Sequence, residues 1–214
     1  MEKNIVCESF GKEDYSFSVC CQGWDKKSKI VVYSFGVGED LSFSEQLVQK
    51  WEQCEIFAFD PTPKAIKFVE QFDKSVFSRF EFYPMGLSDK NITTDFYLPQ
   101  NPDYVSGSEL NSPIVDSNNI VKVQMHTMKY IMDMLGHKHV DLVKMNIEGS
   151  EFAAIIQMLE EVEGIEQICV EFHHRFYSDG EIRLKNTLDS LQSHGYVLVN
   201  TSKSKKEMTF LKEV

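Results

Sequence analysis

The sequence predicts a doubly wound α/β fold with a mostly parallel sheet and an antiparallel C-terminal hairpin. From residue 30 onward, apolar strand-like runs alternate with helical segments, as crossover connections between parallel strands require. The expected central strands are 30–35, 55–59, 80–85, 141–147 and 165–172. Two last strand-like runs, 196–200 and 208–212, flank a polar turn and predict the hairpin. A length of 214 residues fits a single domain, 1–214.

The first two strands are followed by clear helix signals. The run 30–35 is apolar throughout, which is typical of a strand buried on both faces. Ser42 and Glu45 have the spacing of a capping box and predict a helix that ends near residue 50. After the second strand, the prolines of Asp60-Pro61-Thr62-Pro63 prevent further strand and favour a helix over 64–72.

The later elements follow the same pattern, with some additions. The third strand should end in a turn at 86–89, and 92–98 and 120–125 should be added strands. The expected later helices are 127–135, 151–160 and 181–193. The polar segment 99–119 is a long loop for a compact domain, so we expect it on the substrate side. Residues 1–29 lie outside the alternation and are expected to be less regular.

The charge of the chain disfavours a nucleic acid as partner. The formal net charge is −11, whereas phosphate backbones are bound mostly through Lys and Arg. The cluster of Lys203, Lys205 and Lys206 is expected to be a solvated turn between the last two strands. The sequence shows neither a signal peptide nor an apolar run long enough for a membrane helix, which predicts a soluble, cytoplasmic protein.

The five cysteines form no C-x-x-C pair, so they predict neither a zinc site nor a full disulfide framework. Cys54 and Cys169 lie at or in strand-like runs and should be small core residues. A bridge that involves Cys7, Cys20 or Cys21 stays open, since all three lie near the N-terminus.

Residues that follow the strands are the candidate site, because ligands of open α/β sheets bind at the carboxyl ends of the strands. Gly36 and Gly38 follow the first strand, just after Ser34, and would allow a close backbone approach to a ligand. Leu41 stands where a dinucleotide fingerprint has its third glycine, and the acidic pair 39–40 would repel a pyrophosphate. A ligand without phosphates is therefore favoured, with a simple tight turn as the alternative.

Asp60 and Pro61 end the second strand, roughly 20 residues past the glycine turn, where a carboxylate accepts hydrogen bonds from ribose hydroxyls. The alternative is that Asp60 only caps the helix that follows.

Five segments in order resemble the FkbM-type methyltransferases, a branch of the class I S-adenosylmethionine-dependent enzymes. They are VVYSFGVGEDLSF, IFAFDPTPK, GLSDK, VDLVKMNIEGSEF and ICVEFHHR, and they cover about 30–175. KMNIEGSEF is similar to the family signature K-x-D-x-E-G-x-E, and FDPTP to F-E-P-x-P. The resemblance implies a Rossmann-like fold and S-adenosyl-L-methionine as cofactor.

The resemblance also implies roles for particular residues. It assigns Gly36 and Gly38 to the methionine end, Asp60 to the ribose, and Leu87 and Ser88 to the adenine. Asn146 stands where the family pattern has Asp. Its amide oxygen can accept a hydrogen bond from the cofactor's amino group, but it supplies no negative charge.

Methyl transfer to a hydroxyl needs alignment and a base. The candidate bases Glu148 and Glu151 follow the fourth strand, and Glu171, His173 and His174 follow the fifth. Glu171 and His173 should share one face of the strand, with His174 on the other. We expect His173 to be the base, oriented by Glu171 or Glu148, and a small molecule or sugar with a hydroxyl to be the acceptor.

Three alternatives remain open. Glu148, Glu171 and His173 would also suit a divalent metal, although no metal is the preferred interpretation. An NAD-dependent oxidoreductase would share the carboxylate on the ribose. A non-catalytic binding module would keep the fold, and Asn146 is the observation in its favour.

Overall fold

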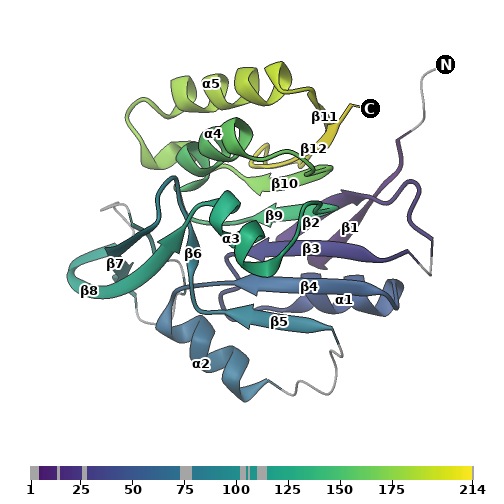
Figure 1. Ribbon diagram of the computed structural model, residues 1–214. Helices are drawn as coiled ribbons and strands as arrows, with labels where there is room; N and C mark the ends of the chain where they lie inside the picture. Colours follow the sequence, from purple (N-terminus) through teal and green to yellow (C-terminus); the bar gives the residue numbers. More distant parts are fainter. Residues whose placement is uncertain are drawn as a thin grey trace.

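A seven-stranded, mostly parallel sheet forms the centre of the protein (Figure 1). The computed structural model describes residues 5–13, 15–25, 28–72, 79–101, 105, 107–109 and 115–213. The strand order is β11-β12-β10-β9-β3-β4-β5. The parallel strands are β3 (Ile30–Phe35), β4 (Cys54–Phe59), β5 (Phe80–Tyr83), β9 (Leu142–Met145) and β10 (Gln167–Glu171). At one edge, β12 (Glu207–Lys212) pairs antiparallel with β10 and with β11 (Tyr196–Thr201), which confirms the predicted fold and hairpin.

Helices cover both faces of this sheet because its strands carry apolar side chains on both faces. All six residues of β3 are buried. Tyr33 and Phe35 lie in the core cluster that also contains residues of the helices α3 (Met128–Leu135), α4 (Glu151–Glu161) and α5 (Gly180–Ser193). Ile30 and Val32 lie in the opposite cluster, with residues of α1 (Ser42–Lys50) and α2 (Pro63–Gln71). The period-two alternation of one strand thus builds two cores.

The N-terminal region is more regular than expected. Strands β1 (Cys7–Lys12) and β2 (Tyr15–Cys20) form an antiparallel hairpin whose Phe10, Phe17 and Val19 are buried in the core on the α1 side. The expectation of a less regular segment is therefore wrong for these strands. Their apolar side chains alternate too briefly to be distinguished from a loop in the sequence, and they are buried only because this face of the sheet lies beneath them.

Side-chain amides attach the hairpin to the rest of the chain, and a disulfide joins its two strands. Gln167 accepts from the backbone N–H of Cys20 at 2.7 Å and donates to its carbonyl at 3.2 Å. Gln46 makes the same pair of bonds with Gly11. Cys7 and Cys20 form a disulfide, which answers the question that the sequence left open. Cys54 and Cys169 are buried free thiols, as predicted.

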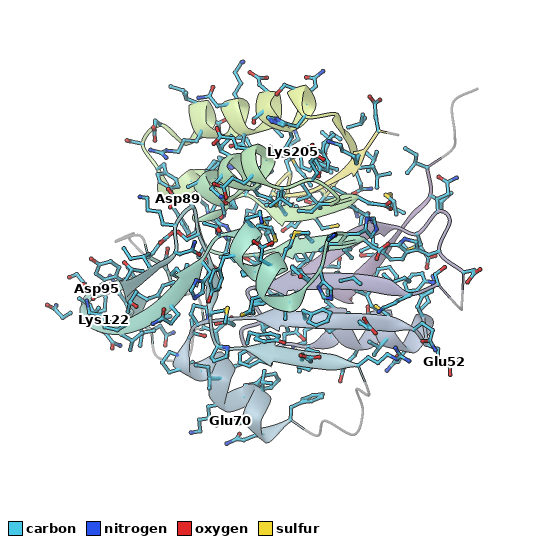
Figure 2. All side chains as sticks on the ribbon, in the orientation of Figure 1. Glu52, Glu70, Asp89, Asp95, Lys122 and Lys205 are labelled. Carbon is cyan, nitrogen blue, oxygen red and sulfur yellow. A yellow bond between two sulfur atoms is a disulfide. The ribbon has the colours of Figure 1, made fainter. Side chains whose placement is uncertain are left out.

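A second, three-stranded sheet lies beyond the carboxyl ends of the central strands, on the left in Figure 1. Its order is β6-β8-β7, from β6 (Gly86–Leu87), β7 (Ile92–Pro99) and β8 (Val115–His126). The expected turn at 86–89 thus contains a short strand. Because β8 begins at Val115, the expected loop 99–119 is shorter, and 102–104, 106 and 110–114 of it lie outside the described residues. Asp95 and Lys122, labelled in Figure 2, pair at 2.5 Å across this hairpin.

Among the α-helices of the described residues, α2 and α3 have a side-chain cap at their start, whereas α1, α4 and α5 have none. The hydroxyls of Thr62 and Thr127 accept from the backbone N–H three residues later, at the starts of α2 and α3. The capping box predicted at Ser42 is wrong, because α1 has Leu41 at its N-cap position and makes no side-chain cap bond there. Asp40 instead accepts from the backbone N–H of Ser42 at 2.9 Å. Among the helices of the described ranges, none is long and apolar enough to span a membrane.

Candidate functional site

A cavity of about 850 Å³ opens at the carboxyl ends of the central strands. Its floor comes from the turns after β3, β4, β9 and β10. Its walls include Tyr15 and Phe17 of the N-terminal hairpin and Phe96 and Met125 of the second sheet. This volume is in the range of cofactor and substrate pockets.

Most of the predicted site residues line this one cavity, although they are far apart in the sequence. The predicted residues along its lining are Gly36, Gly38, Asp60, Pro61, Leu87, Asn146, Glu148, Glu171 and His173. Ser34 and Ser88 are buried but do not line it. Ser34 lies within β3, and the Ser88 hydroxyl is 3.4 Å from both carboxylate oxygens of Glu109.

The turn after β3 requires glycine at position 36. Gly36 has a φ of 78°, and a Cβ there would lie 1.8 Å from the carbonyl oxygen of Asn146. Any side chain would therefore separate β3 from β9. Gly38 also has a positive φ, and its backbone N–H donates to Oδ2 of Asp60 at 2.8 Å.

The carboxylate of Asp60 is 4% exposed and joins the glycine turn to the start of α2. Its Oδ1 accepts from the backbone N–H of Thr62 at 2.8 Å and from the hydroxyl of Thr62 at 2.6 Å. Burial raises the pKa of Asp60, although the hydrogen bonds from Gly38 and Thr62 and the charge of Lys144 oppose this. Thr62 is itself the N-cap residue, so Asp60 supports the cap rather than forming it. Each carboxylate oxygen has two lone pairs, so Oδ1 is fully used and Oδ2 can accept one further bond.

Asn146 presents a hydrogen-bond acceptor without a partner. Its backbone N–H donates to the carbonyl of Phe35 at 3.1 Å, which sets the side chain at the end of β9. The side-chain oxygen Oδ1 is buried and, among the described residues, has no donor. An unpaired buried acceptor is costly, so a donor on a bound ligand would satisfy it. An ammonium group is a donor of this kind.

Lys144 is a buried cation that the sequence reasoning did not assign a role. It is 7% exposed, and its Nζ donates to the carbonyls of Gly36 at 2.8 Å and of Phe35 at 3.3 Å. Burial lowers the pKa of Lys144 to about 8, against the opposing charges of Asp60 and Glu171 among others. A lysine within the otherwise apolar strand 142–145 was the available signal, because buried lysines are rare unless paired.

His173 lies buried among three carboxylates. Its Nε2 is 3.4 Å from Glu148 and 3.6 Å from Glu171, and its Nδ1 is 3.4 Å from Glu151. Burial opposes the charged imidazole, but the contact with Glu151 and the charges of Glu151, Glu148 and Glu171 outweigh it and raise the pKa of His173. This is the arrangement of an acid–base group with its orienting partners.

Glu151 was one of the candidate bases in the sequence, and the structure buries it fully beneath His173. It accepts from the backbone N–H of His173 at 2.6 Å and from that of Gly149 at 2.8 Å. The sequence did not indicate that Glu151 supports His173 instead of acting as the base itself. The expectation that Glu171 and His173 share one face of a strand is wrong. Strand β10 ends at Glu171, and His173 has non-strand backbone angles, so strand alternation does not bring the two side chains together. His174 instead contacts Glu181 at 3.6 Å.

The compact group of potential metal ligands in the described part of the chain lies elsewhere. His139, Asp141 and Glu166 have ligand atoms within 4.8 Å of one another. They precede β9 and β10, at the end of the sheet opposite the cavity. This group shares no residue with Glu148, Glu171 and His173, so the alternative of a metal on those three stays open.

The fold and this cavity define a Rossmann-like methyltransferase that uses S-adenosylmethionine. A family model described as the methyltransferase FkbM domain matches residues 30–198. The chain belongs to this family, which confirms the resemblance seen in the sequence. No curated protein sequence matches the chain.

Solved structures share the fold at low sequence identity. A putative rRNA-methylase from Clostridium thermocellum is 13% identical, with a TM-score of 0.51 over 88% of this chain and 89% of that one. A fibrillarin/Nop5p complex matches at 10% identity and a TM-score of 0.52, over 87% of this chain and 73% of that one. At these identities the likeness concerns the fold and not the substrate.

Proposed function

We propose that the protein transfers the methyl group of S-adenosylmethionine to a hydroxyl oxygen of a small molecule or sugar. The observation that carries this proposal is His173, buried among carboxylates on the wall of the same cavity as the Gly36–Gly38 turn. An alcohol is a weak nucleophile at neutral pH, so its methylation needs a base at the reacting oxygen.

The residues around the glycine turn suit the cofactor. Asn146 Oδ1 would accept a hydrogen bond from the amino group, and the remaining lone pair on Oδ2 of Asp60 would accept from a ribose hydroxyl. Gly36 and Gly38 would admit the methionine end, with Pro61 and Leu87 beside the nucleoside. We place Ser34 and Ser88 behind this wall, where they support it without contact. Glu39 and Asp40 line the cavity as well, which favours a ligand without phosphates over NAD.

Bound S-adenosylmethionine supplies a methyl group on a sulfonium leaving group. His173 Nε2 would take the proton of the acceptor hydroxyl, so that its oxygen could displace the sulfonium and receive the methyl group. The proton would then pass from His173 to solvent. Glu148 and Glu171 orient the imidazole and stabilise its positive charge, while Glu151 holds the backbone and Nδ1 side. His173 must be neutral at the start of each turnover, so the active fraction grows as pH rises.

The proposal is tested by His173→Gln with His174→Gln as the matched control. We expect H173Q to lower methyl transfer by about a hundredfold to ten-thousandfold and to keep its affinity for S-adenosylhomocysteine in calorimetry. H174Q should keep both, since His174 contacts Glu181 instead. Equal rates in H173Q and wild type would overturn the assignment of the base. Cofactor binding without transfer to any hydroxyl compound would instead favour the non-catalytic module.

The proposal also excludes nucleic acid as acceptor and places the protein in the cytoplasm. The net charge of −11 supports the first part. The buried free thiols of Cys54 and Cys169 suit a reducing compartment, whereas the Cys7–Cys20 disulfide weighs against it. Thiol labelling of the protein, isolated from its native cell under acid quench, would show whether Cys7 and Cys20 are oxidised there. Free thiols at both would support the cytoplasm, and a disulfide would indicate an oxidising compartment.

A further inference from the structure

Two basic residues from neighbouring turns line one end of the cavity. Arg175 lies in the 3-10 helix η2 (His174–Phe176), just after β10, and Lys206 lies in the turn between β11 and β12. The backbone N–H of Phe172 donates to the carbonyl of Lys206 at 2.9 Å, which joins the two segments. Lys203 and Lys205 of the same turn are exposed, as expected, and do not line the cavity, while Lys206 is half-buried and does. Figure 2 marks this turn by Lys205.

Arg175 and Lys206 differ from the other basic residues of the cavity. Lys12 pairs with Asp40 at 3.3 Å, and Lys144 donates to the carbonyls of Gly36 and Phe35. Neither Arg175 nor Lys206 has a carboxylate oxygen within 4.0 Å among the described residues. In a chain with net charge −11, two cations in one cavity without such a close ion pair are a local exception. The charge of Arg175 acts on Glu171 and that of Lys206 on Glu207 only at longer range. The two cations create an attractive potential for an anion.

The guanidinium of Arg175 is close to the proposed base. The rings of His173 and Phe176 are 5.1 Å apart, and the Arg175 guanidinium carbon is 4.6 Å from the centre of the Phe176 ring. The imidazole, an apolar ring and a cation therefore follow one another along the wall. Stacking on Phe176 also restricts the guanidinium, which reduces the entropy lost when it binds an anion.

We propose that the methyl acceptor is an anionic hydroxyl compound, whose carboxylate or phosphate binds Arg175 and Lys206 while its hydroxyl meets His173. This inference rests on the proposed methyl transfer to a hydroxyl and names the substrate class of the same site. The nearby acidic residues Glu148 and Glu171 contact His173, at 3.4 and 3.6 Å. Neither forms an ion pair within 4.0 Å with Arg175 or Lys206, so both cations stay available to an anion. A planar guanidinium binds carboxylate and phosphate through paired hydrogen bonds.

The first test compares acceptors in charge-matched pairs with labelled S-adenosylmethionine. A uronate is compared with its methyl ester, and a sugar phosphate with the free sugar. We expect the anionic member to have a kcat/KM at least about tenfold higher, the equivalent of one good charged contact. The pair with the larger ratio of kcat/KM, anionic over neutral, shows whether the site prefers a carboxylate or a phosphate. Equal kcat/KM within every pair that is methylated would overturn the proposal.

The variants Arg175→Gln and Lys206→Met should bring that ratio towards one, mainly through a higher KM for the anionic member. The matched control is Lys203→Met, which removes an exposed charge of the same turn and should keep the ratio. If K203M lowers the ratio as much as R175Q, general attraction and not a site explains the preference, and the proposal is wrong.

A second test does not depend on turnover. Inorganic phosphate at millimolar concentration is titrated into the protein loaded with S-adenosylhomocysteine, and the Nε–H signal of Arg175 is followed by NMR. We expect a saturable shift that K206M weakens and K203M does not. No shift in protein that binds S-adenosylhomocysteine normally would overturn the anion site while leaving the methyltransferase proposal intact. Failure to bind S-adenosylhomocysteine would instead count against the proposed function.

Discussion

The backbone N–H of Gly38 donates to Oδ2 of Asp60 at 2.8 Å and thereby joins the turn after β3 to the end of β4. The two strands are parallel neighbours, with Phe35 opposite Phe59, so both turns begin at the same level of the sheet. The shape of the glycine turn therefore depends on a carboxylate that is 22 residues away in the sequence. A cofactor that approaches this turn meets a backbone that is already fixed.

Asp60→Ala should lower cofactor affinity by about 1 to 3 kcal/mol, the usual cost of losing a hydrogen bond to a charged group. The variant removes a carboxylate for the ribose and also releases the amide of Gly38. Calorimetry with S-adenosylhomocysteine measures the loss. Thr62→Val is the control, because it removes one donor to Oδ1 and leaves the bond to Gly38. Unchanged affinity in D60A would show that the ribose lies elsewhere.

Asn146→Asp restores the acidic residue of the family pattern and should strengthen cofactor binding by about 1 kcal/mol. A charged acceptor forms a stronger hydrogen bond to an ammonium than an amide oxygen does. Asn118→Asp, which adds the same charge at an exposed position of β8, should leave the affinity unchanged. No gain in N146D would remove the reason to suspect a module that has lost its activity.

The pH dependence of kcat/KM should report the ionisation of His173. Its pKa is raised above the ordinary value of 6.5, and the neutral form is the base, so kcat/KM should rise with pH through a midpoint above 6.5. Glu151→Gln should move this midpoint to lower pH, since Glu151 favours the charged imidazole. A rate that falls over this range would show that His173 acts in its charged form.

The same ionisation contributes to stability with a defined sign. A histidine whose pKa is raised in the folded state stabilises the fold fully below 6.5, and this contribution is lost as pH rises through the folded value. The free energy of unfolding should therefore decline with pH in this window, and H173Q should show less of that decline. Denaturant melts at a series of pH values measure both. An identical pH slope in H173Q and wild type would contradict the assignment.

Reduction of the Cys7–Cys20 disulfide should lower the free energy of unfolding by about 2 to 3 kcal/mol, since the bridge closes a short loop. Denaturant melts with and without a reductant measure this. A Cys7→Ser, Cys20→Ser double variant should equal the reduced protein and no longer respond to the reductant. Acceptor binding should weaken too, because Tyr15 and Phe17 of this hairpin line the cavity. If the reductant still lowered the free energy of unfolding of the double variant by the same amount, cysteines other than Cys7 and Cys20 would be responsible.

The central strands, the C-terminal hairpin and the meeting of Gly38 with Asp60 could be predicted from the amino-acid sequence. These follow from local signals, since buried strands read as apolar runs and parallel strands bring their carboxyl ends to one edge. The capping box at Ser42 failed because Asp40, two residues earlier, bonds the amide of Ser42.

The residues that surround the carboxyl ends of these strands could be identified only in the folded structure. The β1–β2 hairpin is ordered by contacts such as Gln167 with Cys20, 147 residues apart, which no local pattern encodes. Glu151 and Lys144 became part of the site through burial, and burial of a charged side chain depends on which distant carbonyls, amides and imidazoles come to lie around it. Sequence periodicity indicates which face of a helix or strand is buried. The groups that pair with a buried charge come close to it only when the chain folds.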